Sequence, residues 1–254
     1  MLHRRGFLKS AAGAPFAAVL ASPELARAAA AGLETVTLTT AGGRSVSGAL
    51  ARPAAAKAPA VLLVHEWWGL NDQIKATAAE FAKAGYLALA VDLYDGTVAT
   101  SPDQARATMQ KVVGAEATDT LVSWAGWLRA HEASAGPLGT VGWCFGGGWS
   151  LRASMATPVE ATIVYYGNVR QPADKLAGLK GPVLGHFATL DRWINKEMVD
   201  GFEAEMAKAG RPLTVHWYEA DHAFANPSGG RYDEADAKLS WQRSLEFFAT
   251  HLKG

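Results

Sequence analysis

The ten residues VGWCFGGGWS, Val141–Ser150, contain the only cysteine of the chain and four of its 26 glycines. An apolar run typical of a strand precedes them, and a segment of helical composition follows. A tight turn between a strand and a helix strains the residue at its apex, so the positions two residues away must lack side chains. Gly142 and Gly146 meet that requirement around Cys144. The pattern predicts that Cys144 is a nucleophile on this turn rather than a small core residue, with a helix N-terminus behind it that favours a thiolate.

Strand and helix patterns alternate on both sides of this turn. Apolar runs typical of strands that are covered on both faces occupy residues 58–66, 86–94, 137–143, 160–167, 181–188 and 212–219. Helical patterns occupy residues 71–85, 102–131, 146–156, 194–210 and 232–252, and residues 34–40 and 44–52 form a predicted strand pair. The alternation predicts an α/β fold with a mostly parallel central sheet and helices on both faces. A ligand is then expected at the carboxyl ends of the strands.

The first thirty residues have the layout of an export signal. A basic start, MLHRRGFLKS, precedes a small apolar run and the small residues of ELARAAAA. Arg4 and Arg5 ahead of GFLK resemble a twin-arginine signal, and the apolar run is short of the roughly 20 residues that span a membrane. We therefore predict an export signal over residues 1–30, cleavage between Ala28 and Ala31, and a single α/β domain over residues 31–254. The mature protein is expected in the bacterial periplasm without a stable membrane anchor.

The composition limits the partners that the domain is expected to have. Its 24 basic and 24 acidic residues balance, so nothing indicates a nucleic-acid partner. A single cysteine excludes an internal disulfide, and the seven histidines are scattered without the spacing of a metal site. We expect a monomer that needs no metal or other cofactor and acts on a small molecule.

A cysteine that transfers an acyl group needs a base and a group that orients the base. In α/β hydrolases with this kind of turn, the acid and then the histidine follow the nucleophile along the chain. Asp191 and His222 each come directly after a predicted strand, which places both at the expected edge of the sheet. Asp221 is less suitable, because adjacent side chains in an extended chain point apart, and Asp200 lies within a helix. The sequence therefore predicts a triad of Cys144, His222 and Asp191.

Glu66 ends the first buried strand, in the stretch VLLVHEWWGL. On position alone it is equally well explained as a salt-bridged loop carboxylate. In α/β hydrolases the loop after this strand supplies one N–H group of the oxyanion hole, and the residue after the nucleophile supplies the other. The backbone amides of Trp67 and Phe145 are therefore the predicted oxyanion donors.

Six stretches resemble the dienelactone hydrolase family, also called carboxymethylenebutenolidases: HEWWGLND, GYLALAVDLYDG, VGWCFGGGWS, YYG, LDRW and VHWYEADHAFAN. The resemblance covers nearly the whole chain after the signal. It implies an α/β-hydrolase fold and hydrolysis of an ester or lactone, and it places Cys144, Asp191 and His222 on the family's triad. It also implies that Glu66 takes the proton of the Cys144 thiol once substrate binding disturbs this glutamate, so that the thiolate forms only with substrate present.

The sequence departs from the family where the substrate carboxylate is bound. The family uses two arginines, one of them four residues after the catalytic histidine, and this chain has Asn226 there. Arg106 lies on the helix that corresponds to the second arginine, although the spacing does not align cleanly. We expect neutral esters or lactones to react at least as well as carboxylated ones. The expected substrate contacts are Arg106, Asn226, Trp68 and Trp193; Trp67 and Trp143 are further aromatic residues that either wall the pocket or fill the core.

Two other functions are compatible with the same residues. A thioesterase or acyltransferase would use the same triad and differ only in its substrate. A non-catalytic ligand-binding protein of the cell envelope could have kept the scaffold of a hydrolase. The presence of all three triad residues and of Glu66 favours an enzyme over the binding protein.

Overall fold

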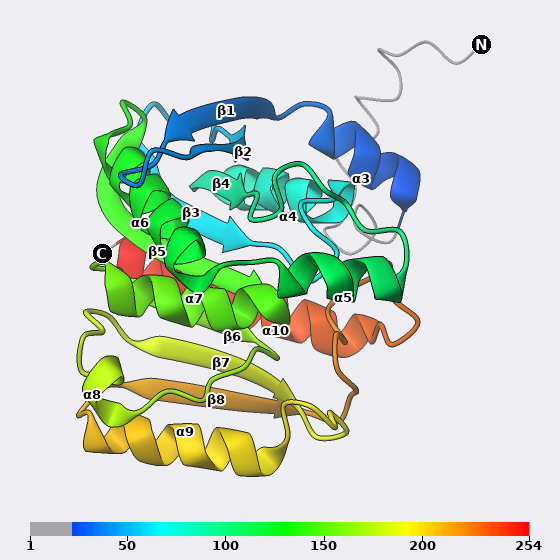
Figure 1. The fold of residues 1–254 in the computed structure, drawn as a ribbon, viewed down its shortest axis with the longest axis vertical. Helices are drawn as coiled ribbons and strands as arrows, with labels where there is room; N and C mark the ends of the chain where they lie inside the picture. Colours follow the sequence, from blue (N-terminus) through cyan, green and yellow to red (C-terminus); the bar gives the residue numbers. More distant parts are fainter. Residues whose placement is uncertain (1–21, 254) are drawn as a thin grey trace.

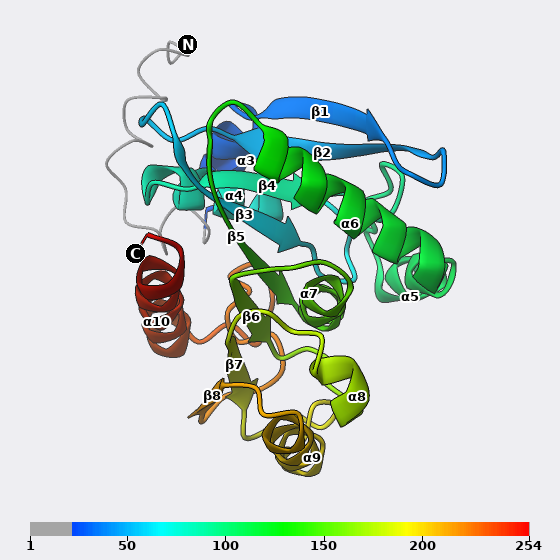
Figure 2. The ribbon, with the colours of Figure 1, turned by 90° about the vertical axis from the view of Figure 1, so that its left-hand side faces the viewer.

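The computed structural model describes residues 22–253 of the chain. The first part of the predicted export signal, which includes Arg4, Arg5 and most of the short apolar run, lies outside the described residues. The described residues build a central sheet with helices packed on both of its faces (Figures 1 and 2).

Eight strands form one sheet in the order β1-β2-β4-β3-β5-β6-β7-β8. In chain order they are β1 (Glu34–Thr39), β2 (Ser45–Ala51), β3 (Ala58–Val64), β4 (Leu87–Val91), β5 (Ser134–Trp143), β6 (Ala161–Tyr165), β7 (Val183–Ala188) and β8 (Leu213–Tyr218). The pairs β1–β2 and β2–β4 are antiparallel, whereas all pairs from β4 to β8 are parallel. This sheet confirms the predicted α/β fold and its mostly parallel order.

The helices that follow the strands divide between the two faces of the sheet. They are α4 (Asp72–Lys83), α5 (Pro102–Gln110), α6 (Gly114–Ala130), α7 (Phe145–Ala156), α8 (Ala173–Leu176), α9 (Lys196–Lys208) and α10 (Glu234–Leu252). α4 and α10 pack on one face of the sheet, and α6, α7 and α9 pack on the other. Figure 2 shows α10 on one side of the strands and α6 and α7 on the opposite side.

The two packed faces explain why the central strands are apolar throughout. Successive side chains of a strand point to opposite faces, so a strand covered on both faces needs apolar residues at every position. In β3, Val61 and Leu63 pack toward α4 and α10, while Leu62 and Val64 pack toward α6. All four of these side chains are fully buried.

The register of the parallel strands brings the predicted site residues to one edge of the sheet. Val64 of β3 pairs with Gly142 of β5, and Trp143 of β5 pairs with Tyr165 of β6. The residues directly after these strands therefore leave the sheet side by side. The helices at this edge begin next to them, because each parallel strand leads into a helix that returns along the sheet.

Residues 23–30 form a further helix, α3 (Pro23–Ala30), although they lie in the predicted export signal. The side chain of Ser22 caps this helix by accepting a hydrogen bond from the Leu25 N–H (3.3 Å). Ala26 is buried against Ala76 of α4. The last part of the predicted signal is thus packed on the domain, and the predicted cleavage between Ala28 and Ala31 would divide this helix.

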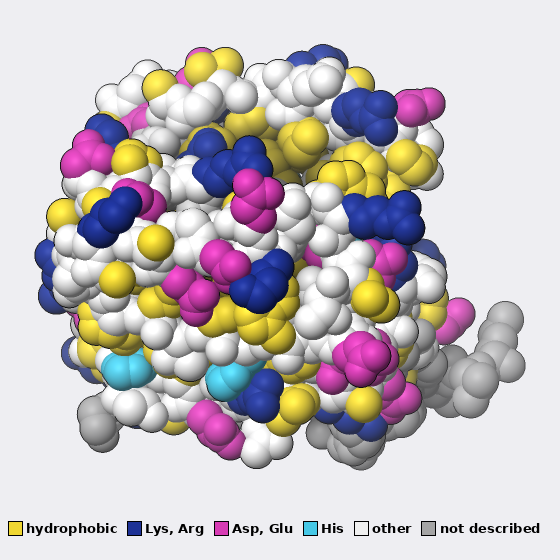
Figure 3. Space-filling model, turned by 90° about the horizontal axis from the view of Figure 1, so that it is seen from below, with side chains coloured by type: hydrophobic (Ala, Val, Ile, Leu, Met, Phe, Trp, Pro, Cys, Tyr) yellow, Lys and Arg dark blue, Asp and Glu magenta, His cyan; other side chains and the backbone are white. Residues whose placement is uncertain are grey.

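The surface carries charges of both signs. Seen from the side of α9 and β8, Lys and Arg side chains alternate with Asp and Glu side chains, and hydrophobic side chains form small groups between them (Figure 3). No helix within residues 22–253 combines the length and the hydrophobicity that a membrane span requires.

Candidate active site

Cys144 lies on the turn between β5 and α7 and has φ 52° and ψ −116°, in the positive-φ region that glycine favours. A Cβ atom on Gly142 would overlap the carbonyl oxygen of Gly146, and one on Gly146 would overlap the carbonyl oxygen of Val64. Both glycines are therefore required by close backbone contacts around the turn. The strained apex and its two glycines have the geometry that the sequence predicts for a nucleophile.

The side chains of Cys144, His222 and Asp191 form a continuous chain of contacts. Nε2 of His222 lies 3.1 Å from Sγ of Cys144, and Nδ1 of His222 lies 2.6 Å from Oδ2 of Asp191. Oδ1 of Asp191 accepts hydrogen bonds from the backbone N–H groups of Trp193 (2.8 Å) and Ile194 (3.0 Å). The loop after β7 thus fixes the carboxylate, the carboxylate fixes the imidazole, and the imidazole faces the sulfur.

Electrostatic interactions favour the charged forms of His222 and Asp191. Burial alone would lower the pKa of His222, but its hydrogen bonds to Asp191 and Cys144 and the negative charges of both raise the pKa to about 10. Burial would raise the pKa of Asp191, yet the hydrogen bond and charge of His222 and the two backbone N–H groups lower it. Because the charge of Cys144 contributes to the pKa of His222, the imidazolium is most stable once the sulfur is a thiolate.

The two rejected carboxylates are occupied elsewhere. Oδ1 of Asp221 accepts the backbone N–H of His222, and its Oδ2 pairs with Arg231 (3.2 Å). Asp200 lies on α9 and pairs with Lys196 four residues earlier (2.7 Å). Neither carboxylate contacts the imidazole ring, which agrees with the choice of Asp191 made from strand order.

Glu66 is almost fully buried, with 3% of its surface exposed. Its Oε1 accepts a hydrogen bond from the Tyr166 hydroxyl (3.3 Å), and its Oε2 accepts one from the side-chain amide of Asn226. Burial raises its pKa, and the charge of His222 and these two hydrogen bonds offset that rise only in part. The structure thus gives Glu66 two partners that the sequence did not reveal. The sulfur of Cys144 contacts His222, and no hydrogen bond joins it to Glu66 among residues 22–253.

Tyr166 is the residue in contact with Glu66 and His222 that sequence reasoning missed; Trp149 and Arg152 of the cavity wall were not predicted either. Tyr166 comes directly after β6, has φ 35° and is fully buried. Its ring meets the His222 ring edge to face at 5.2 Å. Burial and the negative charges of Glu66 and Cys144 all raise the pKa of its hydroxyl, so the tyrosine lies near both groups. Only the stretch YYG, quoted above for the resemblance, marked this position in the sequence.

The proposed oxyanion donors are both available. Within residues 22–253, no protein acceptor is hydrogen-bonded to the backbone N–H of Trp67 or Phe145. α4 and α9 begin with asparagine side chains that cap them, whereas α7 begins at Cys144 without a side-chain cap. The first N–H groups of α7 are therefore free to stabilise negative charge beside the sulfur.

A cavity of about 950 Å³ opens over Cys144. Its wall combines aromatic and apolar side chains with three arginines. The lining residues that the argument uses are Trp67, Trp68, Trp149, Trp193, Arg106, Arg152, Arg231, Tyr166 and Asn226. Its size and largely apolar lining suit an organic small molecule.

The cavity contains all four residues predicted to contact the substrate, with two qualifications. Asn226 is 5% exposed and its amide is held by Glu66, so it offers little to a ligand. Trp193 is 58% exposed and covers His222 with its ring at 5.2 Å. Of the aromatic residues considered for the wall, Trp143 does not line this cavity; it is buried and stacks on Tyr165 at 5.5 Å.

Comparisons with known proteins agree with this geometry. Residues 46–252 match the family model described as "Dienelactone hydrolase family". The chain is 28% identical over 232 residues to the carboxymethylenebutenolidase of Pseudomonas putida. This alignment covers 85% of this chain and 96% of that protein. It is 25% identical over 224 residues to carboxymethylenebutenolidase 1 of Cupriavidus pinatubonensis, covering 84% of this chain and 95% of that protein.

Solved structures show the same fold. The dienelactone hydrolase-like promiscuous phosphotriesterase P91 from metagenomic libraries superimposes with a TM-score of 0.79 at 21% identity, covering 87% of this chain and 99% of that one. A thermophilic esterase of Thermogutta terrifontis gives a TM-score of 0.64 at 17% identity, covering 87% of this chain and 93% of that one. At these identities the likeness extends to the α/β-hydrolase fold alone.

Proposed function

The chain belongs to the dienelactone hydrolase family, and from this premise we propose that it hydrolyses an ester or a lactone by covalent acyl transfer through Cys144. The observation that carries the proposal is the chain of contacts from Cys144 through His222 to Asp191 at the floor of the cavity. A nucleophile, a base and a group that orients the base are the minimum for such a transfer.

The proposed reaction has two halves. The thiolate of Cys144 attacks the carbonyl carbon, and the N–H groups of Trp67 and Phe145 stabilise the negative oxygen that forms. The intermediate collapses to a thioester as His222 gives its proton to the departing alkoxide. His222 then takes a proton from a water molecule, which attacks the thioester and releases the carboxylic acid and the thiolate.

Glu66 is proposed to take the proton of the Cys144 thiol when substrate binds, the role that the family resemblance implies. The cavity is lined by Tyr166 and Asn226, which hold the Glu66 carboxylate, so a substrate in the cavity would disturb both hydrogen bonds. A buried carboxylate that loses hydrogen bonds becomes a stronger base. The thiolate that results then stabilises the imidazolium of His222.

The natural substrate is proposed to be an organic ester or lactone large enough to contact the aromatic wall. A thioesterase or acyltransferase with the same triad and a binding protein without activity are the alternatives. The test is a panel of aryl esters, lactones and thioesters, with Cys144→Ala as the blank. Turnover of esters or lactones that Cys144→Ala abolishes supports the proposal; turnover confined to thioesters favours the second function, and no turnover of any member favours the third.

We further propose that the protein is exported to the periplasm by a twin-arginine signal and acts there as a monomer. The support is the sequence of residues 1–30 alone. Replacing Arg4 and Arg5 with lysine is expected to leave precursor in the cytoplasm, as measured by cell fractionation. Mass spectrometry of the exported form locates the cleavage site relative to α3, and unchanged export of the double variant would contradict the twin-arginine proposal.

A further inference from the structure

His65 is a fully buried histidine that the proposed reaction does not use. It follows β3 and directly precedes Glu66. Its Nδ1 lies 2.6 Å from the backbone oxygen of Glu66, and its Nε2 lies 3.2 Å from the backbone nitrogen of Leu93. A buried side chain whose two ring nitrogens both contact backbone groups restricts the movement of those groups.

The two partners determine where the proton of His65 lies. A carbonyl oxygen can only accept, so Nδ1 must carry the hydrogen and donate it to the oxygen of Glu66. The Leu93 N–H can only donate, so Nε2 must be unprotonated. Burial lowers the pKa of His65, although the Glu66 carbonyl and the charge of Asp92 act in the opposite direction. The ring is therefore neutral and held as a single tautomer.

The hydrogen bond to Glu66 also orients Trp67. The carbonyl of Glu66 and the N–H of Trp67 belong to the same peptide group, which is planar and trans, so they point in opposite directions. The same oxygen accepts a second hydrogen bond, from the Gly69 N–H (3.2 Å). With its oxygen held at two points, the peptide plane cannot turn, and the Trp67 N–H keeps the direction opposite to His65.

The other proposed oxyanion donor also lies beside His65. The imidazole ring stacks on the ring of Phe145, with 5.8 Å between the centroids and 18° between the planes. A Cβ on Gly146 would overlap the backbone oxygen of His65, so the turn between β5 and α7 is in direct contact with the end of β3. The His65 side chain thus contacts the Glu66–Trp67 peptide group, which carries one donor, and the ring of Phe145, the residue that carries the other.

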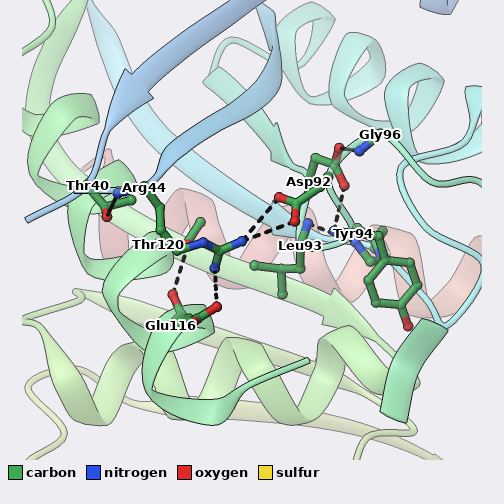
Figure 4. Close-up of polar contacts among 10 residues, drawn as sticks. Thr40, Arg44, Asp92, Leu93, Tyr94, Gly96, Glu116 and Thr120 are labelled. Atoms are coloured by element: carbon green, nitrogen blue, oxygen red, sulfur yellow. Dashed lines mark hydrogen bonds and ion pairs between the residues drawn. The ribbon is translucent and has the colours of Figure 1, made fainter. Parts of the chain in front are cut away.

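The loop that holds His65 is itself anchored (Figure 4). The carboxylate of Asp92 accepts the backbone N–H groups of Tyr94 (2.8 Å) and Gly96. Next to it, Asp95 receives two hydrogen bonds from the guanidinium of Arg44, each 3.2 Å long. These contacts fix the chain on both sides of Leu93, so the Leu93 N–H is a rigid donor for Nε2.

We propose that His65 is a positioning residue that holds the Glu66–Trp67 peptide plane with the Trp67 N–H directed at the oxyanion. The inference rests on the proposed acyl transfer, because only a reaction with a tetrahedral oxyanion uses this donor. It assigns to His65 a part in transition-state stabilisation without contact with the substrate.

Two variants of nearly equal shape test the proposal. In His65→Asn the side-chain amide nitrogen replaces Nδ1 and can still donate to the Glu66 oxygen, whereas His65→Leu has no donor. Both leave the Leu93 N–H without its partner, so their difference isolates the bond to Glu66. Removing one oxyanion donor costs about 10²–10³-fold in kcat, and we expect the misdirected donor of His65→Leu to lower kcat about 10–100-fold. His65→Asn should stay within about threefold of the wild type by the same reasoning, with KM little changed in both.

A second measurement separates this role from a general loss of structure. Alkylation of Cys144 by iodoacetamide displaces iodide and forms no oxyanion, so its rate should be the same in both variants. The affinity for an aryl trifluoromethyl ketone, whose adduct with a thiolate carries an oxyanion, should fall in His65→Leu in parallel with kcat. If His65→Leu does not fold, His65→Gln replaces it, since that side chain can still accept the Leu93 N–H.

Equal kcat values for the Asn and Leu variants, or parallel losses of hydrolysis and alkylation, would overturn the proposal. Absence of hydrolysis in the wild type is a different result: it rejects the proposed acyl transfer itself. A wild type that hydrolyses esters, combined with indistinguishable variants, rejects only the role of His65.

Discussion

Two buried carboxylates lie near the Cys144–His222 pair, and their surroundings shift their pKa values in opposite directions. Asp191 follows β7 and accepts two backbone N–H groups as well as the imidazole, and its pKa is lowered. Glu66 follows β3 and accepts only a tyrosine hydroxyl and an amide side chain, and its pKa is raised because burial dominates.

The difference shows how one edge of a sheet can place two carboxylates in surroundings that act on their charge in opposite ways. Backbone N–H groups are fixed by the fold, so Asp191 stays ionised and orients His222. The partners of Glu66 are side chains in the cavity wall, which a ligand can move. Pairs of carboxylates whose environments separate their pKa values divide the work of permanent anion and proton carrier between them.

The largest effect is expected when the fixed anion is removed. Asp191→Asn keeps the shape and the two backbone contacts but favours the wrong tautomer of His222, which in serine-protease triads costs about 10⁴-fold in kcat. We expect kcat/KM to fall about 10³–10⁴-fold. Asp200→Asn, on the exposed side of α9, is the matched control and should change kcat/KM less than twofold. A loss below tenfold for Asp191→Asn would remove Asp191 from the triad.

The same substitution should have a pH-dependent effect on stability. A lowered pKa in the fold means that Asp191 stabilises the protein above its unfolded pKa of about 3.9 and loses this contribution as the pH falls. The raised pKa of His222, about 10, means that its contribution is complete below its unfolded value and is lost as the pH rises through 10. Urea unfolding should therefore show the largest deficit of Asp191→Asn between about pH 4 and 6.5.

Removing the Glu66 carboxylate should lower activity and raise stability. A positioned proton acceptor contributes about 10²–10⁴-fold, and we expect Glu66→Gln to lower kcat/KM about 10²-fold. Because burial raises the pKa of Glu66, the fold favours the protonated form, and the wild type loses stability as the pH rises through that pKa.

Glutamine keeps the shape without the charge, so Glu66→Gln should unfold at a higher urea concentration than the wild type at pH 7. The gain should disappear near pH 4, where the wild-type carboxyl is protonated. A variant that is less stable than the wild type at pH 7 would show that the charge of Glu66 is stabilising, and unchanged kcat/KM would remove it from the proton transfer.

A further prediction concerns which group holds the thiol proton in the free enzyme. A buried Glu66 carboxylate that is ionised at pH 6 opposes a second negative charge on Cys144, so we expect slow alkylation of the free enzyme at this pH. An aryl ketone substrate analogue that contacts Tyr166 and Asn226 should accelerate alkylation by non-overlapping reagents about tenfold, a factor that corresponds to about 1.4 kcal/mol. Rapid alkylation at pH 6 without a ligand would instead show that the proton already resides on His222.

Short sequence patterns were enough to predict that Cys144, His222 and Asp191 lie together, because the ends of parallel strands meet at one edge of a sheet. Cys144 was marked by its two glycines, and Asp191 and His222 by their places after apolar runs. The fold was predictable for the same reason: a strand covered on both faces is apolar at every position. Each of these features is a short-range pattern, so it can be recognised within a single short segment of the sequence.

The partners within the site were not predictable, because they join distant parts of the chain. Asn226 lies 160 residues from Glu66 in sequence, and Tyr166 lies 100 residues from it. Asn226 was predicted to contact the substrate because it stands where the family resemblance places an arginine, but its amide donates a hydrogen bond to Glu66. The sequence did not decide whether Trp143 walls the pocket or fills the core. In the structure its ring stacks on that of Tyr165.

The smallest effect is expected for the charge of the substrate. Asn226 does not replace the family's arginine, since its amide is bound to Glu66. Arg231 is paired with Asp221 and lies over the ring of Trp193 at 5.1 Å. Arg106 of α5 and Arg152 of α7 line the cavity, and no carboxylate in residues 22–253 pairs with either.

Both of these arginines are exposed, and an exposed ion pair contributes about 0–1 kcal/mol, or up to about fivefold, which salt reduces further. We therefore expect kcat/KM for a neutral lactone and its carboxylated analogue to agree within about fivefold, with the ratio closer to one at 0.5 M salt. Arg106→Gln and Arg152→Gln should each shift the ratio toward the neutral lactone, whereas Arg170→Gln, outside this cavity, should not. A preference above about 100-fold for the carboxylated lactone would require a buried, bidentate contact, which an exposed arginine does not make. That result would mean that one of these arginines closes over the substrate, and the variant that abolishes the preference would identify which one.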